Sequence, residues 1–319
     1  MDNLVGGAMK YIENKGVRLS VFSLGTVQLG MDYGICGKTD KPTEEYAHGM
    51  LDAAICHGVN NFDTANNYGD SERVIGSWLK KIPKEKRPII VTKIGPFDHA
   101  SDETLKADIY AQTERCLETL GVDVIDVLMV HNFEDYMKNP AIVSECFASL
   151  KRKGIIRLSA LSAYSYHDYG LIASSGFDAV QIPLNIFDLA RIEDGGIKKI
   201  ADAGMMIFVR SVFLQGLVFL TPKNLDPRMS FAAAYLEKFG KLADEFGMTP
   251  DVLAASFVLS VNGVATIVLG CQTVEQIISN VNLIDKVRKL SDGEMSMIRD
   301  AFLNIDPRVI NPRLWFNAY

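Results

Sequence analysis

The sequence predicts an α/β fold in which eight parallel strands and their helices close into a (β/α)₈ barrel. Short apolar runs rich in Val, Ile and Phe alternate with longer segments of helical spacing almost to the end of the chain. The runs are apolar throughout, as expected for a parallel sheet covered by helices. Eight such units in 319 residues match a barrel, which typically takes about 250 residues.

The elements follow in order along the chain. Residues 9–20 place Asn-Lys-Gly between two short alternating runs, which predicts a hairpin able to plug the barrel floor. The expected strands are residues 21–25, 59–63, 89–93, 124–130, 155–161, 179–184, 206–211 and 266–270. Helical spacing predicts helices within residues 44–58, 71–82, 101–121, 139–154 and 229–247. One more helix and a tail that folds back over one face are expected after Leu290.

A doubly wound parallel sheet is the competing fold. It is disfavoured because the first strand runs into Leu-Gly-Thr-Val-Gln-Leu-Gly and not into a GxGxxG turn. Long linkers and low-complexity segments do not interrupt the chain, so residues 1–319 are expected to form one domain.

Composition and charge exclude several classes of protein. The 33 basic and 39 acidic side chains give a net charge of −6 without a basic cluster, so nucleic acid is not an expected partner. The longest apolar run is interrupted by Arg210 and Gln215, which argues against a membrane span. The N-terminus lacks the pattern of a secretory signal. The five cysteines are scattered and form no CxxC pair, which favours a reducing cytoplasm: Cys36, Cys56, Cys116, Cys146 and Cys271. The sequence also shows no set of His, Cys or carboxylate residues with the spacing of metal ligands.

Polar side chains stand at the ends of successive expected strands. In a barrel these ends meet at one mouth, where functional groups belong. The residues concerned are Asp63, Lys93, His131, Ser162, Gln181, Arg210 and Gly270. Tyr68 lies five residues past Asp63, in the loop that follows the second strand.

Four of these residues make chemical sense together as a proton donor to a carbonyl oxygen. The phenol of Tyr68, with an ordinary pKa of about 10, needs a neighbouring cation to exchange a proton at neutral pH. Lys93 supplies that cation, and the carboxylate of Asp63 would keep it charged. His131 would hydrogen-bond the substrate oxygen and help to orient it.

Taken singly, each residue has a structural interpretation. Tyr68 alone resembles a half-buried loop aromatic, and Lys93 a solvated strand end. His131 alone would be a structural histidine, and Asp63 a cap for the following turn. Their joint placement on successive strand ends favours the catalytic interpretation.

The ordered motifs resemble the aldo-keto reductase superfamily over nearly the whole chain, in its bacterial type. They are GTVQLG, NFDTANNYGDSE, VTKIG, LMVHNF, GIIRLSALSAY, AVQIPLNIFD and VLGCQTVEQIISN. The resemblance implies hydride transfer between a nicotinamide cofactor and an aldehyde or ketone. It matches Tyr68 to the family's general acid, Lys93 and Asp63 to the residues that tune it, and His131 to the residue that positions the carbonyl.

The resemblance also assigns residues to the cofactor, with NADP(H) expected first and NAD(H) as the alternative. Ser162 and Gln181 match positions that hold the nicotinamide carboxamide, but Ala163 stands where Asn is usual. Arg210 takes the place of a stacking aromatic ring. Further cofactor positions are Gly25, Thr26, Ser211, Gly270, Gln272, Gln276 and Asn280. Gln272 is uncharged where many members carry a cation for the 2′-phosphate, and a helix beginning near Thr273 would offer N–H groups to a phosphate.

Other singled-out residues receive structural interpretations. Glu72 is expected to act electrostatically near the start of its helix, Cys271 to be a half-buried small residue, and Met205 and Met206 to fill the core. The remaining histidines are expected at the surface: His48, His57, His99 and His167. The expected substrate is a small carbonyl compound in an open site lined by Tyr33, Phe97, Phe213 and Trp315.

Two other functions stay open at this stage. A nicotinamide-binding regulatory subunit would keep the same barrel and read the redox state of the cofactor. A barrel isomerase or aldolase acting on sugar phosphates would use a Lys or Glu without nicotinamide.

Overall fold

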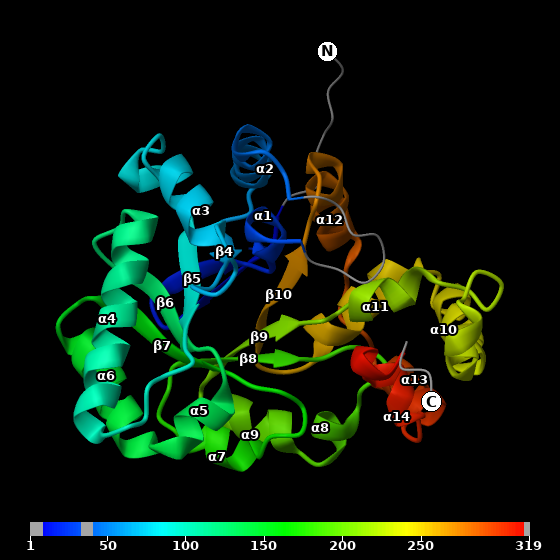
Figure 1. The fold of residues 1–319 in the computed structure, drawn as a ribbon. Helices are drawn as coiled ribbons and strands as arrows, with labels where there is room; N and C mark the ends of the chain where they lie inside the picture. The colour runs from blue at the N-terminus through cyan, green and yellow to red at the C-terminus, as the bar shows by residue number, and fades with distance from the viewer. Residues whose placement is uncertain (1–8, 33–40, 316–319) are drawn as a thin grey trace.

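The computed structural model describes residues 9–32 and 41–315, and its centre is a closed barrel of eight parallel strands (Figure 1). The barrel strands are β3 (Phe22–Gly25), β4 (Asn61–Asp63), β5 (Ile89–Ile94), β6 (Ile125–Val130), β7 (Ile156–Ser162), β8 (Ala179–Pro183), β9 (Met206–Arg210) and β10 (Val264–Gly270). Each pairs with its neighbours in chain order, and β10 closes the ring on β3. The predicted barrel is therefore confirmed and the doubly wound sheet excluded.

Helices surround the barrel on its outer side (Figure 1). The helices are α1 (Val27–Gly30), α2 (Glu44–Cys56), α3 (Ser71–Leu79), α4 (Asp102–Leu120), α5 (Phe133–Lys138), α6 (Pro140–Arg152), α7 (Tyr169–Ala173), α8 (Ala190–Glu193), α9 (Gly196–Asp202), α10 (Ala233–Glu245), α11 (Pro250–Ser260), α12 (Val274–Lys286), α13 (Asp292–Phe302) and α14 (Pro307–Ile310). Short 3₁₀ segments lie at η1 (Lys84–Lys86), η2 (Leu214–Phe219), η3 (Pro227–Ala232) and η4 (Pro312–Leu314).

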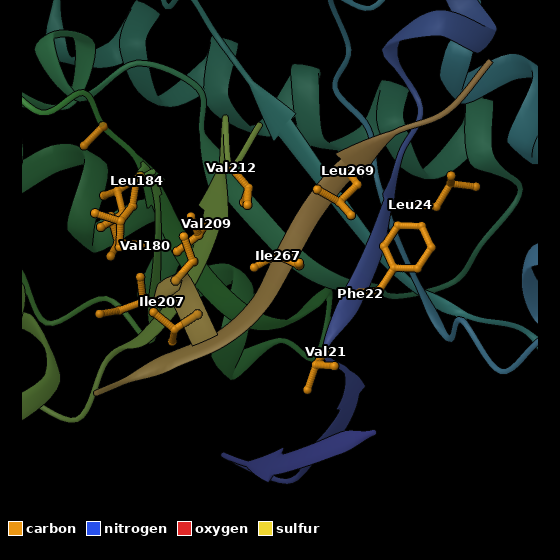
Figure 2. Packing of buried hydrophobic residues seen from close by; sticks show 14 of the residues in the cluster. Val21, Phe22, Leu24, Val180, Leu184, Ile207, Val209, Val212, Ile267 and Leu269 are labelled. Carbon is orange, nitrogen blue, oxygen red and sulfur yellow. The ribbon is translucent and has the colours of Figure 1, made fainter. Parts of the chain in front are cut away.

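The buried apolar residues form two clusters, an inner one inside the barrel and an outer one between the strands and the helices. Along β5, Ile90 and Ile94 belong to the outer cluster, whereas Val91 belongs to the inner one. This alternation follows from the two-residue period of a strand. Figure 2 shows the outer cluster on β3, β9 and β10, where Phe22 and Ile267 are fully buried. Burying a side chain of this size stabilises the fold by about 1.5–3 kcal/mol.

An antiparallel hairpin closes the floor of the barrel. It consists of β1 (Tyr11–Asn14) and β2 (Val17–Ser20), joined through Lys15 and Gly16, which both adopt positive φ. Val17 and Leu19 belong to the inner cluster, among side chains from β5 to β10. The predicted plug is confirmed.

Candidate active site

The predicted site residues share the inward-facing side of their strands. Val127 and Met129 of β6 lie in the inner cluster, and the next position with the same orientation is His131. Lys93 follows Ile89 and Val91 of β5 in the same way. The inward positions at the ends of β7, β8 and β9 are Ser162, Gln181 and Arg210. The barrel interior therefore ends in a ring of polar groups at the carboxyl ends of its strands.

Lys93 and Asp63 form an ion pair inside this ring. Lys93 is fully buried and Asp63 is 3% exposed. The Nζ atom lies 2.7 Å from Asp63 Oδ2 and also donates to the carbonyl of Thr64 at 2.8 Å. Burial lowers the pKa of Lys93, but the charge of Asp63 and the oxygen of Tyr68 more than offset this, so that the pKa is raised. Lys93 is therefore a cation at neutral pH.

The second oxygen of Asp63 accepts a hydrogen bond from Gln181. Gln181 Nε2 lies 2.7 Å from Asp63 Oδ1, and Gln181 is 2% exposed. The structure thus brings Gln181, expected at the nicotinamide carboxamide, into the group around Lys93. A carboxylate that accepts on both oxygens is held in one orientation.

Tyr68 lies over Lys93 and beside His131. Lys93 Nζ is 5.1 Å from the centre of the Tyr68 ring. The rings of Tyr68 and His131 meet edge to face, with 5.7 Å between their centres and 78° between their planes. All four residues expected to act on a carbonyl group are therefore adjacent.

The loop that carries Tyr68 is packed closely against α1. A Cβ at Gly30 would overlap the carbonyl oxygen of Tyr68, and Ser71 N donates to that same oxygen at 3.1 Å. Tyr68 N donates to Ala65 O at 3.1 Å. Glycine at position 30 therefore lets the chain bring Tyr68 to the mouth of the barrel.

His131 is neutral at physiological pH. Burial, together with the positive charges of Lys93 and Arg210, lowers its pKa to about 3. Its Nδ1 atom is buried and has no hydrogen-bond partner among the described residues. A neutral imidazole at this place can still donate one hydrogen bond to a ligand oxygen.

Arg210 reaches across the mouth of the barrel toward the loop after β7. Its guanidinium lies over the ring of Tyr164, 4.5 Å from the ring centre, and Nη2 donates to Ala163 O at 3.3 Å. Ser211 follows with a positive φ of 64°. The guanidinium, which by the family resemblance stands in the place of a stacking aromatic ring, is thus held against Tyr164.

The segment expected to hold adenosine lies where β3 and β10 meet. A Cβ at Gly25 would come 3.3 Å from Gly270 N, and a Cβ at Gly270 would overlap the side chain of Gln28, so both positions are closely packed. Gln276 Oε1 accepts from Gln272 N at 2.7 Å, and Asn280 Nδ2 contacts Cys271 Sγ at 3.2 Å. The uncharged amides and a helix N-terminus fit the sugar and phosphate of a dinucleotide.

The helix start in this segment matches its prediction. α12 begins at Val274, and the hydroxyl of its N-cap, Thr273, accepts from Gln276 N. The first N–H groups of a helix lack acceptors within the helix, which makes them available to a phosphate.

Thr26, also expected at the cofactor, uses its side chain inside the protein. Its hydroxyl is buried, donates to Asp63 O at 2.9 Å and lies 2.9 Å from Ser71 Oγ. Thr26 thus ties β3 to β4 and α3.

Several residues lie elsewhere than expected. His48 and His167 are buried and not at the surface, with 9% and 7% exposure. Cys271 is 1% exposed and not half-buried, and burial raises its pKa to about 12. Glu72 does lie in the first turn of α3, but it is buried and accepts from Thr92 Oγ1 at 2.6 Å.

The expected lining of the substrate site is met only in part. Trp315 is 2% exposed and donates from Nε1 to Arg308 O at 2.9 Å, so it packs on its own tail. Phe97 is 7% exposed, whereas Phe213 is partly buried beside Phe219. Tyr33 lies outside the described residues. Met205 and Met206 are buried, as expected for core residues.

A cavity of about 380 Å³ lies between α11 and α12, lined among others by Asp251, Glu275 and Lys286, and none of the four carbonyl-directed residues lines it. Among residues 9–32 and 41–315, His, Cys, Asp and Glu side chains do not gather into a group of three able to hold a metal. Over the same residues, every helix is too short or too polar to cross a bilayer.

Tyr68, Lys93, Asp63 and His131 thus gather at the mouth of a closed eight-stranded barrel. The model of the aldo/keto reductase family matches residues 22–302. The chain belongs to the aldo/keto reductase family, whose members are oxidoreductases that use nicotinamide cofactors and act on small carbonyl compounds.

Relatives from bacteria and fungi match most of the chain. The NADH-specific methylglyoxal reductase of Escherichia coli is 26% identical, over 89% of this chain and 95% of its own. Aldo-keto reductase str7 of Strobilurus tenacellus is 27% identical, over 87% and 86%. A putative voltage-gated potassium channel subunit beta of Schizosaccharomyces pombe is 25% identical, over 95% of both chains.

Solved structures show the same fold. The holo form of the aldo-keto reductase AKR11C1 from Bacillus halodurans has a TM-score of 0.73 with 21% identity, and the match covers 95% of this chain and all of that one. An aldo-keto reductase from Pseudomonas aeruginosa, itself described as putative, has a TM-score of 0.65 with 24% identity, covering 88% and 97%.

Proposed function

We propose that this protein is a nicotinamide-dependent reductase that converts an aldehyde or ketone to an alcohol, with Tyr68 as the general acid. The observation that carries the proposal is the buried ammonium of Lys93, which pairs with Asp63 and lies under the ring of Tyr68. A fixed cation beside a phenol stabilises the phenolate that remains after the proton is given away.

Each residue of the cluster has a separate task in this mechanism. Tyr68 donates its hydroxyl proton to the carbonyl oxygen, and Lys93 stabilises the resulting phenolate. Asp63, held by Gln181, keeps Lys93 charged. Neutral His131 hydrogen-bonds the carbonyl oxygen and orients it. A reduced nicotinamide dinucleotide held at the barrel mouth would supply the hydride.

The cofactor residues are proposals of the same kind. Ser162, Gln181, Arg210 and Ser211 would hold the nicotinamide end at the carboxyl ends of β7 to β9. The adenosine end would lie over the residues where β3 and β10 meet: Gly25, Thr26, Gly270, Gln272, Gln276 and Asn280. Thr26 would contribute through backbone placement, because its hydroxyl is already bonded inside the protein.

NADP(H) is the cofactor that the family resemblance favours, and NAD(H) is the alternative. Gln272 provides no charge for a 2′-phosphate, and the Escherichia coli relative is named as NADH-specific. Initial rates with NADPH and with NADH, at matched carbonyl concentration, decide between them. The same relative makes methylglyoxal a reasonable first substrate to test, followed by short aldehydes, ketones and sugars. A cytoplasmic location is part of the proposal.

Replacement of Tyr68 by Phe tests the mechanism. The hydroxyl is lost while the ring stays, so kcat should fall by at least about a hundredfold, the lower range for general acid catalysis. Binding of NADPH or NADH, measured by the quenching of protein fluorescence, should persist. A fully active Tyr68→Phe variant would refute the assignment.

A regulatory, nicotinamide-binding subunit is the second candidate. It is favoured by the likeness to the Schizosaccharomyces pombe protein named as a putative channel subunit. Incubation with reduced cofactor and the carbonyl panel separates the two functions, because a sensor would bind the dinucleotide without steady-state oxidation.

A further inference from the structure

We propose that Gln112 of α4 is a positioning residue, which fixes the loop of Tyr68 relative to the loop that follows Lys93. The inference rests on the proposed role of Tyr68 as the proton donor. The two loops are residues 64–70, between β4 and α3, and residues 95–101, between β5 and α4.

Gln112 is a polar residue on the buried face of its helix. It is 6% exposed and shares that face with Ile109, Thr113 and Cys116, which are also buried. An amide buried without hydrogen bonds destabilises the fold, so its place on an apolar face requires partners.

The amide of Gln112 makes four hydrogen bonds. Its Oε1 accepts from Asn66 Nδ2 and from Gly95 N, each at 2.9 Å. Its Nε2 donates to Pro96 O at 3.0 Å and to Asp108 Oδ2 at 2.9 Å. Both amide N–H donors and both lone pairs of the oxygen are therefore used. Flipping the amide would place N–H groups opposite N–H groups, so one orientation is selected.

These bonds end close to the reacting groups along the chain. Asn66 precedes Tyr68 by two residues, and Gly95 follows Lys93 by two. Asn66 N also donates to Lys93 O at 3.0 Å, so the main chain already joins the loop of Tyr68 to the end of β5 at one point. Gln112 adds a second attachment, through the side chain of Asn66. Two attachments restrict rotation of the loop about the first.

A small displacement of Asn66 would reach Tyr68 directly. Residues 65–68 form a tight turn closed by the bond from Tyr68 N to Ala65 O. The hydroxyl of Tyr68 has to stay near Lys93 and the carbonyl oxygen at the same time. Misplacement of a reacting group by about 1 Å can lower the rate on the order of a hundredfold.

The hydrogen bonds of Gln112 act as a staple between the two loops. Two substitutions remove this staple in different ways. Gln112→Leu deletes all four hydrogen bonds at similar volume, and Gln112→Glu keeps the shape while replacing both donors with an oxygen near Asp108. We expect each to lower kcat by about tenfold to a hundredfold. The dissociation constant of NADPH or NADH should stay within about twofold, because a staple on Tyr68 leaves the residues proposed for the cofactor in place.

Thr113→Val is the matched control. Thr113 is the next buried polar residue of α4, and among the described residues its hydroxyl bonds within the helix alone, to Ile109 O at 2.8 Å. This variant should keep the kcat of the parent protein. A pH profile adds a readout that simple destabilisation does not move: wider spacing of Tyr68 and Lys93 should shift the alkaline limb of kcat to higher pH.

Tyr68→Phe measured in the same series separates the inference from the function on which it rests. An active Tyr68→Phe overturns the proposed function itself. An inactive Tyr68→Phe with unchanged kcat in folded Gln112→Leu and Gln112→Glu overturns the role of Gln112 alone. Loss of kcat together with loss of cofactor binding also overturns it, since the damage would then be general.

Asn66→Ala keeps the inference testable if the Gln112 variants do not fold. It removes the same bond from the loop side, where the residue is half-buried. It should lower kcat as Gln112→Leu does, and the double variant should be no worse than the more severe single variant. Additive losses would show that the two residues act independently and would contradict the staple.

Discussion

Lys93 and Asp63 form an ion pair inside the barrel mouth, with 2.7 Å between Nζ and Oδ2 and almost no solvent exposure of either side chain. The pair holds a cation where an apolar interior would otherwise exclude one. Removing one partner leaves the other charge, or its polar substitute, buried and poorly matched.

Asp63→Asn and Lys93→Met are therefore each expected to lower the free energy of unfolding by about 3–5 kcal/mol. The double variant should lose less than the sum of the two, because the second substitution removes the uncompensated group. Urea unfolding followed by circular dichroism measures all three. Breaking the exposed pair Lys84 and Asp123, whose Nζ and Oδ2 atoms lie 2.8 Å apart, should leave the unfolding transition unchanged. Strict additivity of the buried pair would contradict this prediction.

His131 should make the protein sensitive to acid. Its pKa is about 3 in the folded chain and ordinarily 6.5. Between these values the unfolded chain binds a proton that the folded chain does not, so the free energy of unfolding falls as the pH falls. Between pH 7 and pH 5 this amounts to about 2 kcal/mol. His131→Gln should lose that much less over the same range in thermal and urea unfolding, and an equal loss would argue against a neutral histidine.

Gly30→Ala should displace Tyr68. The added methyl group would overlap the carbonyl oxygen of Tyr68, which lies in backbone that cannot move independently of the ring. We expect kcat to fall at least about tenfold, with a lower melting temperature. Gly49→Ala on α2 is the control, because nothing lies within 4 Å of its added Cβ. That variant should gain about 0.5–1 kcal/mol of stability and keep full activity.

Gln272→Arg should shift the cofactor preference toward NADPH. A guanidinium at this position would pair with the 2′-phosphate, and its charge-assisted hydrogen bonds are worth about 1.5–3 kcal/mol. The ratio of kcat/KM for NADPH over NADH should rise by at least about tenfold, and the gain should shrink at high salt. Asn282→Arg, at an exposed position farther along α12, provides a comparison for general charge effects. An unchanged ratio would place the 2′-hydroxyl elsewhere.

The strands and the site were predictable for related reasons. A strand of a covered parallel sheet is apolar on both faces, so the sequence alone shows continuous apolar runs around Val91 and Val127. A polar residue at the end of such a run, such as Lys93, is expected at the barrel mouth, because the carboxyl ends of the strands meet there. Asp63, Lys93 and His131 are predictable because each stands at or next to a strand end, and Tyr68 because it lies in the loop that follows β4.

Long-range contacts were beyond the reach of the same patterns. The bond between Gln181 and Asp63 joins residues 118 positions apart, and amides carry no signal that separates a ligand contact from a protein contact. His167 looked like a loop residue, yet Tyr164 N donates to its ring and Phe133 packs on it. Gln112 is a polar residue on an apolar face of α4, which is a weak signal in the sequence. The partners that explain its position lie in two other loops.

The closure of β10 on β3 has a consequence for synthesis of the chain. Thr266 hydrogen-bonds Ser20 across a separation of 246 residues, and β10 pairs with β3 in register from Phe22 to Gly25. Until the ribosome has released β10, β3 therefore has one unsatisfied edge and the hairpin covers an incomplete ring. Contacts of such separation slow folding and leave strand edges open to other chains. The nascent protein is exposed to aggregation for most of its translation, and chaperone demand should fall sharply once residue 270 has emerged.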